Sequence, residues 1–136
     1  MKHNITISCS KTNLTLIRDF VNATLSTYGI NEIETHKLVL AVDEVCANLI
    51  IHANQCNTGQ HLELGIDVAP GSQILFVIRD NGTVFDITKY NAPSLDEIVS
   101  SKRKGGLGLL LVKRIMDKIE FTTEKNHNIC TLIKNL

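Results

Sequence analysis

Apolar and polar residues alternate along this chain in two different periods, and each period predicts one kind of element. Residues 5–7 alternate apolar with polar side chains, as expected for a short half-buried strand. Between residues 14 and 28, apolar side chains recur every three or four positions, which predicts an amphipathic helix. Thr12 or Asn13 could cap the start of this helix, and Gly29 stands where a helix C-cap is expected.

A second helix is predicted from residue 31 to residue 53. It is apolar around more of its circumference than the first helix, so we expect it to be more buried. The polar residues 54–59 break it. Residues 61–68 and 73–79 are then typical of strands, and the Pro-Gly turn between them favours an antiparallel hairpin.

The remainder of the chain begins with a long segment of weak periodicity, residues 81–106, in which we place one short helix near residues 95–100. A segment of this length outside regular structure in a small domain is usually functional or mobile. Beyond it the pattern predicts a helix over 107–116, a strand over 119–123, a turn at 126–128 and a final strand over 129–134.

Helices and strands in this order do not alternate as they would in a doubly wound parallel sheet. We therefore predict an α/β two-layer sandwich, with one mixed, largely antiparallel sheet that carries helices on one face. The chain has 136 residues, of which 43% are hydrophobic, and this is enough for a single compact domain over residues 1–136. A nucleotide would enter such a fold between the helix layer and the long loop.

Composition narrows the partners that can be expected. Fourteen basic and fourteen acidic residues cancel, so no overall field draws the chain to nucleic acid or to an anionic membrane. The four cysteines form no CxxC pair, which favours reduced thiols. The N-terminal pattern differs from a signal peptide, and no 18 apolar residues run together. We expect a soluble, cytoplasmic protein with no direct nucleic-acid or membrane partner.

A carboxylate and a carboxamide lie four residues apart within the second helix. Glu44 and Asn48 therefore project from the same helix face into one cavity. Asn48 can offer its amide oxygen to Mg²⁺, and Glu44 can accept a proton from an attacking hydroxyl. A solvated polar stripe is the ordinary explanation of such a pair, but here the pair interrupts an apolar segment. Asp43 competes for the role of base but points about 100° away around the helix.

A second carboxylate, Asp80, ends an apolar strand, where burial is costly unless a group donates to it. The exocyclic amino group of adenine is a suitable donor. Gly82 would let the backbone pass close to the base, although Asp-Asn-Gly is also simply a good turn sequence.

Glycines gather where the next helix is expected to begin. Gly105, Gly106 and Gly108 remove Cβ atoms there, so that unpaired N–H groups at the helix start could receive phosphates. Lys104 and its basic neighbours, residues 102–103, could supply charge, or part of this run could form a solvated loop. A dinucleotide fingerprint is discounted, because GxGxxG should directly follow the first strand and is absent here.

These three motifs together resemble those of the GHKL ATPases, the superfamily of gyrase, histidine kinases and heat-shock chaperones. Residues 44–48 resemble its N box, residues 80–82 its G1 box and residues 106–109 its G2 box. The resemblance covers nearly the whole chain and is greatest to the small anti-sigma factor serine/threonine kinases of bacteria.

The resemblance implies a Bergerat-type α/β sandwich that binds ATP with Mg²⁺ and transfers phosphate to a Ser or Thr of an anti-sigma-factor antagonist protein. It makes Glu44 the catalytic base, Asn48 the Mg²⁺ ligand and Asp80 the reader of adenine, with Thr131 as an adenine-side contact on the last strand. The candidate nucleotide-binding residues are Asn48, Asp80, Gly82, Lys104, Gly105, Gly106, Leu107, Gly108 and Thr131.

Two functions of different class remain open. The first is a serine/threonine protein kinase that acts as an anti-sigma factor or a similar switch, and Glu44 favours it because binding alone needs no base. The second is a nucleotide-binding module that sequesters a partner, which could be a sigma factor, without transferring phosphate. A metal site at His52, Cys56 and His61 has no established ligand spacing. The edge at residues 5–7 would allow a homodimer, since relatives often pair through the first strand and helix.

Overall fold

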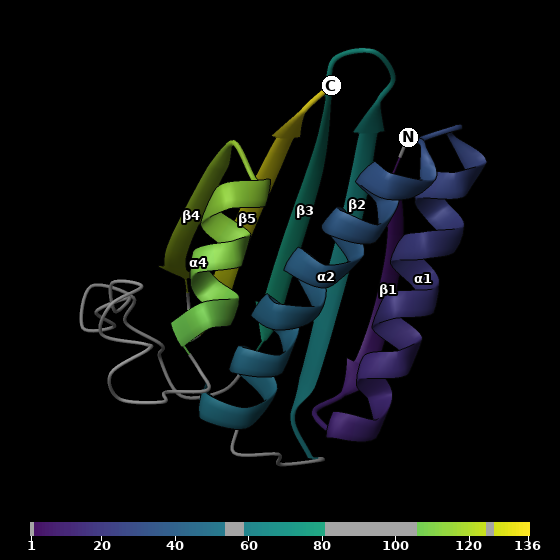
Figure 1. Ribbon diagram of the computed structural model, residues 1–136. Coiled ribbons are helices and arrows are strands. Elements are labelled where there is room, and N and C mark those ends of the chain that lie inside the picture. Colours follow the sequence, from purple (N-terminus) through teal and green to yellow (C-terminus); the bar gives the residue numbers. More distant parts are fainter. Residues whose placement is uncertain (1, 54–58, 81–105, 125–126) are drawn as a thin grey trace.

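The fold is a helix layer packed on one face of a single sheet (Figure 1). The structure is a computed structural model that describes residues 2–53, 59–80, 106–124 and 127–136. Five strands lie in the order β1-β2-β3-β5-β4, and every pairing among them is antiparallel. The elements are β1 (Lys2–Ser8), the 3-10 turn η1 (Lys11–Asn13), α1 (Leu14–Thr27), α2 (Glu32–Asn48), the π-helical turn η2 (Leu49–Ala53), β2 (His61–Ala69), β3 (Gln73–Asp80), α4 (Gly106–Ile115), β4 (Lys118–Glu124) and β5 (His127–Asn135).

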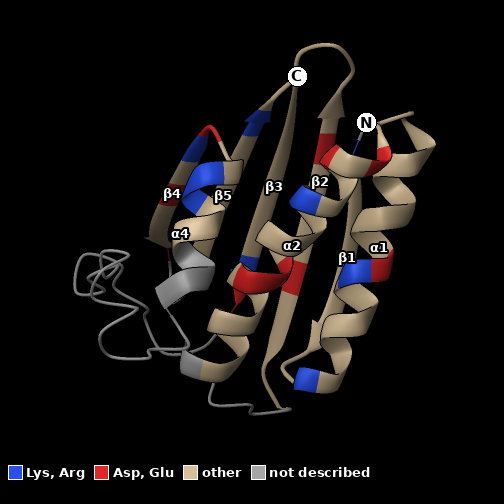
Figure 2. Ribbon diagram, in the orientation of Figure 1, with Lys and Arg blue, Asp and Glu red and all other residues tan. Residues whose placement is uncertain are grey.

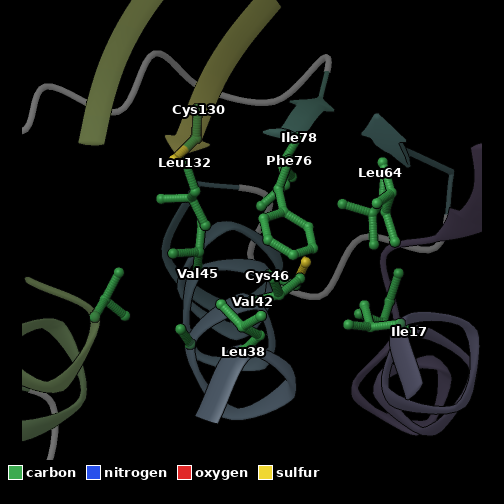
Figure 3. Packing of buried hydrophobic residues seen from close by; sticks show 14 of the residues in the cluster. Ile17, Leu38, Val42, Val45, Cys46, Leu64, Phe76, Ile78, Cys130 and Leu132 are labelled. Carbon is green, nitrogen blue, oxygen red and sulfur yellow. The ribbon is translucent and has the colours of Figure 1, made fainter. Parts of the chain in front are cut away.

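The core fills the space between the sheet and the helices. Alternate side chains of the strands face the helix layer, and in β2 the buried ones are Leu62, Leu64, Ile66 and Val68. Figure 3 shows Phe76 of β3 directed towards Val42 and Cys46 of α2. Burial of a side chain of this size stabilises the folded state by about 1.5–3 kcal/mol.

The first helix is anchored to the first strand at its start. Asn13 is its N-cap residue, as predicted, but its amide nitrogen donates to the Ser8 carbonyl at 3.0 Å and to the Ser8 hydroxyl at 2.9 Å. The side chain therefore ties the end of β1 to the start of α1 instead of capping the helix. At the other end Gly29 has φ 71°, the left-handed conformation that ends many helices.

The second helix begins where the sequence predicts and changes character near its end. Asn31 caps it, because its side-chain oxygen accepts a hydrogen bond of 2.8 Å from the Glu34 N–H. The α-helix ends at Asn48 and continues as the π-helical turn η2, where an unbroken helix to residue 53 was predicted. Single π turns within helices are frequent at functional sites.

The β2–β3 hairpin is confirmed. The Ser72 N–H donates to the Ala69 carbonyl at 2.9 Å, and Gly71 has φ 74°, as the third residue of a type II turn requires. The last strand differs from the prediction, because β5 begins at His127 and includes residue 128, which was expected to lie in a turn. The short helix predicted near residues 95–100 lies outside the described residues.

Ion pairs secure the end of the molecule at which α2 begins. The Lys134 Nζ lies 3.6 Å from Glu34 Oε1 and 3.8 Å from Asp117 Oδ2, so β5 is joined to the start of α2 and to the residues after α4. Figure 2 shows basic and acidic residues interspersed over the described elements. No helix in the described part of the chain is long and apolar enough to span a membrane.

Candidate functional site

The predicted motifs meet at one end of the molecule. Asn48 is the last residue of α2, Asp80 is the last residue of β3, and Gly106 is the first of α4. The register of β3 with β5 pairs Asp80 with Asn128, near the start of β5. Figure 1 shows all four of these element ends at the same end of the molecule, and the β2–β3 hairpin at the opposite end. The topology therefore gathers groups that lie as far as 80 residues apart in the sequence.

A hydrogen bond holds the carboxylate of Asp80 inside the fold. Asp80 is 1% exposed and Asn128 is 5% exposed, and the Asn128 Nδ2 donates to Asp80 Oδ1 at 3.0 Å. A charge-assisted bond of this kind offsets part of the cost of burying a carboxylate. It also restrains the orientation of the Asp80 carboxylate.

Asn128 is a residue that the sequence analysis missed, and Thr131, which it proposed as an adenine-side contact, lies away from Asp80. Thr131 pairs with Val77 and lies three positions after Asn128 on the same strand, so its side chain leaves the opposite face of the sheet. The structure therefore does not bring Thr131 to Asp80. The turn predicted at residues 126–128 placed Asn128 outside the last strand, so the sequence analysis did not consider it as a partner of Asp80.

Glu44 and Asn48 occupy successive turns of α2, and both side chains are half-buried. Burial raises the pKa of the Glu44 carboxyl, and the neighbouring Asp43 carboxylate raises it further. A carboxylate with a raised pKa is a better proton acceptor than an ordinary one. The arrangement fits the base and metal-ligand roles that the sequence suggested for the pair.

Asp43 has a different position, between the two long helices. Its Oδ1 lies 3.9 Å from the Arg18 Nε of α1, and its side chain is 17% exposed. Burial raises the pKa of the Asp43 carboxyl, and the Arg18 guanidinium opposes that rise. Asp43 therefore joins α2 to α1 and does not share the face of Asn48.

The glycine-rich motif is described only in part. Gly106 begins α4, which agrees with the hypothesis that phosphates bind at the start of this helix. The N-terminus of α4 lies at the same end of the molecule as Asn48 and Asp80 (Figure 1). Leu107 and Gly108 lie within its first turn. The predicted contacts at Gly82, Lys104 and Gly105 lie outside the described residues.

The cysteines near this site are core side chains, and the described residues form no cluster of His, Cys, Asp and Glu ligands. Cys46 and Cys130 are buried and unbridged. Burial raises the pKa of the Cys46 thiol well above its usual range and that of Cys130 to about 12, so both remain uncharged core side chains. Cys56 lies outside the described residues, and within the described ranges no group of three or more His, Cys, Asp or Glu side chains could hold a metal ion.

The family follows from a match over almost the whole chain. A profile described as "Histidine kinase-like ATPase domain" matches residues 7–134. The chain belongs to this family. A curated relative named "Serine-protein kinase RsbW", from Halalkalibacterium halodurans, is 33% identical over 98 residues, or 68% of this chain and 57% of the relative. A protein of the same name from Staphylococcus aureus (strain JH9) is 27% identical over 128 residues, or 90% of this chain and 80% of the relative.

A solved structure confirms the fold. The RsbU and RsbW domains of Rv1364c from Mycobacterium tuberculosis superimpose with a TM-score of 0.67 at 13% identity, over 98% of this chain and 32% of that one. The predicted α/β sandwich with helices on one face of the sheet is therefore correct. The match to the Halalkalibacterium protein spans 57% of that protein, a little over half of its length.

Proposed function

We propose that this chain is an ATP-dependent serine/threonine protein kinase of the cytoplasm. It transfers phosphate to a Ser or Thr of an anti-sigma-factor antagonist protein and so works as an anti-sigma factor, with a sigma factor as second partner, or as a similar switch. The observation that carries the proposal is the half-buried pair Glu44 and Asn48 at the same end of the fold as the Asp80–Asn128 pair. Membership of the ATPase family and the names of the relatives support it.

Adenine is recognised at the buried pair. The Asp80 carboxylate accepts a hydrogen bond from the exocyclic amino group of adenine, and Asn128 keeps that carboxylate in place from the other side. Guanine carries a carbonyl oxygen at the same position, and this oxygen would face the Asp80 carboxylate, which is also a hydrogen-bond acceptor. The pair therefore favours ATP over GTP.

The triphosphate lies between Asn48 and the start of α4. The Asn48 amide oxygen is a hard neutral donor of the kind that Mg²⁺ accepts among waters and phosphates. Bound Mg²⁺ would neutralise charge on the phosphate oxygens. The N–H groups at the first turn of α4 donate to the same phosphates, aided by the helix dipole.

Glu44 handles the proton of the acceptor. It takes the proton from the Ser or Thr hydroxyl while the hydroxyl oxygen forms a bond to the γ-phosphorus. The bond from that phosphorus to the β,γ-bridging oxygen breaks, and ADP leaves with the electron pair. The raised pKa of Glu44 suits this task, because a more basic carboxylate holds the transferred proton better.

The test compares Glu44→Gln with Glu32→Gln, a change at an exposed glutamate in the first turn of the same helix. Each variant is mixed with γ-³²P-labelled ATP, Mg²⁺ and purified antagonist domains from the same genome. We expect Glu44→Gln to bind ATP normally and to lose phosphate transfer, and Glu32→Gln to retain both. Transfer at the original rate by Glu44→Gln would refute the assignment of the base. Binding of ATP by the unaltered chain without any labelled acceptor would favour the sequestering module.

A further inference from the structure

Large apolar side chains lie exposed along one helix, on the line that contains Glu44. The exposed large apolar residues in the described part of the chain are Leu16, Ile33, Leu40, Ile51 and Leu136. Ile33 and Leu40 belong to α2, and Ile51 belongs to the turn η2 that continues it. Their exposed fractions are 72%, 45% and 37%.

These residues form a stripe with Glu44, which we call the α2 stripe: Ile33, Leu40, Glu44 and Ile51. Measured around the helix axis from Asp43, Ile33 lies at about 80°, Leu40 at about 60° and Glu44 at about 100°. Leu40 precedes Glu44 by about 6 Å along the axis, and Ile51 follows it by roughly 10 Å. Exposed apolar side chains therefore stand both before and after Glu44 along α2 and its continuation η2.

The stripe lies next to the nucleotide side of α2 but is distinct from it. Figure 1 shows α2 between α1 and α4 in the helix layer. Asp43 faces α1, since it pairs with Arg18, and Asn48 lies about 140° further round, towards α4. Glu44 lies between these two residues around the helix, about 40° from Asn48, so it is the member of the stripe nearest to the proposed phosphates.

Packing of the core does not require these apolar residues. The buried residues of α2 include Leu38, Val42 and Cys46, which point to the sheet from the opposite side of the helix (Figure 3). Single exposed apolar residues are ordinary. An aligned set around a half-buried carboxylate is different, because apolar patches rimmed by polar groups mark interaction surfaces.

We infer that the α2 stripe is the docking surface for the phosphoacceptor segment of the protein substrate, with apolar side chains of that segment resting on Leu40 and Ile51. The inference rests on the proposed function, since a substrate segment contacts the α2 stripe only if it brings its Ser or Thr hydroxyl to Glu44. Its occupant is therefore a protein segment in which apolar residues flank the acceptor Ser or Thr.

Two other occupants fit less well. A second copy of this chain, paired stripe to stripe about a twofold axis, would press the two Glu44 carboxylates together in an apolar contact. A membrane surface would have to bury the same carboxylate among acyl chains. An acceptor hydroxyl avoids both costs, because it donates a hydrogen bond to Glu44.

The test replaces the apolar side chains with a neutral residue that favours helices, in Leu40→Gln and Ile51→Gln. The probe is the antagonist protein that the unaltered chain labels from ATP. Each change should raise the KM for this protein roughly three- to tenfold, as expected for the loss of one partly buried apolar contact. The kcat, the affinity for ATP and the melting temperature should stay unchanged, and Leu40→Met should restore the original KM.

Leu16→Gln is the matched control. Leu16 is 49% exposed on α1, close to the 45% of Leu40. It lies two residues before Arg18, about 160° round the helix from the side that reaches α2. The KM for the acceptor should not change in this variant.

Each contrary result has a separate meaning. An unchanged KM in the Leu40 and Ile51 variants, with transfer intact, would overturn the docking surface and leave the proposed kinase standing. A lowered melting temperature would show that the chain itself covers the stripe, and dissociation of a dimer in sedimentation would show that a second copy does. Absence of any labelled acceptor for the unaltered chain would refute the proposed function itself.

Discussion

The bond between Asn128 and Asp80 is the part of the site that a single substitution tests most directly. Asn128→Ala removes the amide nitrogen that donates to Asp80 Oδ1 at 3.0 Å, and Asp80 is only 1% exposed, so water replaces it poorly. Hydrogen bonds to charged groups contribute about 1.5–3 kcal/mol. For a chain of 136 residues this corresponds to a fall of roughly 5–12 °C in the melting temperature.

The same substitution should weaken nucleotide binding. Without the Asn128 amide, the Asp80 carboxylate is no longer held in the plane that the adenine amino group approaches. We expect the affinity for ATP to fall roughly tenfold, the equivalent of one hydrogen bond of about 1.4 kcal/mol. GTP donates no such hydrogen bond to Asp80 in the unaltered chain or in Asn128→Ala, because guanine has a carbonyl oxygen where adenine has the amino group. The ratio of the affinities for ATP and GTP should therefore fall by the same factor.

Thr131→Ala is the control, because Thr131 lies on the same strand and is partly buried, but its side chain is on the other face of the sheet from Asn128. Differential scanning calorimetry and calorimetric titration with ATP and GTP in the presence of Mg²⁺ give the two quantities for both variants. If Asn128→Ala resembles Thr131→Ala in melting temperature and in affinity for ATP, the role assigned to the buried pair is wrong.

Three further predictions concern the rest of the site and the core. Asn48→Ala should abolish the Mg²⁺-dependent part of ATP binding. If calorimetric titration in the presence of Mg²⁺ gives the same affinity for ATP in this variant and in the unaltered chain, Asn48 is not a metal ligand. The Asp43 carboxylate raises the pKa of Glu44, so Asp43→Asn should lower that pKa and move the acid limb of the pH–rate profile for transfer to lower pH. Asp19→Asn, at an exposed position of α1, should leave the profile where it was. Phe76→Ala should lower the free energy of unfolding in urea by about 3–5 kcal/mol, because it empties the centre of the core, and a loss below about 1 kcal/mol would contradict that packing.

Local periodicity was sufficient to predict most of the fold. In β2 and β3 the side chains alternate strictly between core and surface, and the Pro-Gly turn between these strands takes the conformation that its residues favour. The amphipathic spacing of α1 likewise predicts the helix and its end at Gly29. The change to a π turn after Asn48 carries no such signal, because the apolar residues that follow suit either kind of helix.

The orientation of β5 could not be predicted in the same way. Residues 129–133 are mostly apolar on both faces of the sheet, since one face packs under the helices and the other is only half-exposed. A shift of one residue exchanges the two faces of a strand. Only the pairing of β3 with β5 decides that Asn128 faces Asp80 and that Thr131 does not.

The environment of Glu44 argues for transfer over mere binding. In the proposed site, Asn48 and Asp80 serve nucleotide binding, and a neutral residue at position 44 would avoid the cost of partly burying a carboxylate. Instead the helix keeps a carboxylate that is half-buried, lies beside Asp43 and interrupts a stripe of exposed apolar side chains. Burial and the negative charge of Asp43 both disfavour the ionised form of the Glu44 carboxyl. Proteins keep such an unfavourable carboxylate mainly at functional sites. Proton transfer during phosphate transfer uses a carboxylate of this kind.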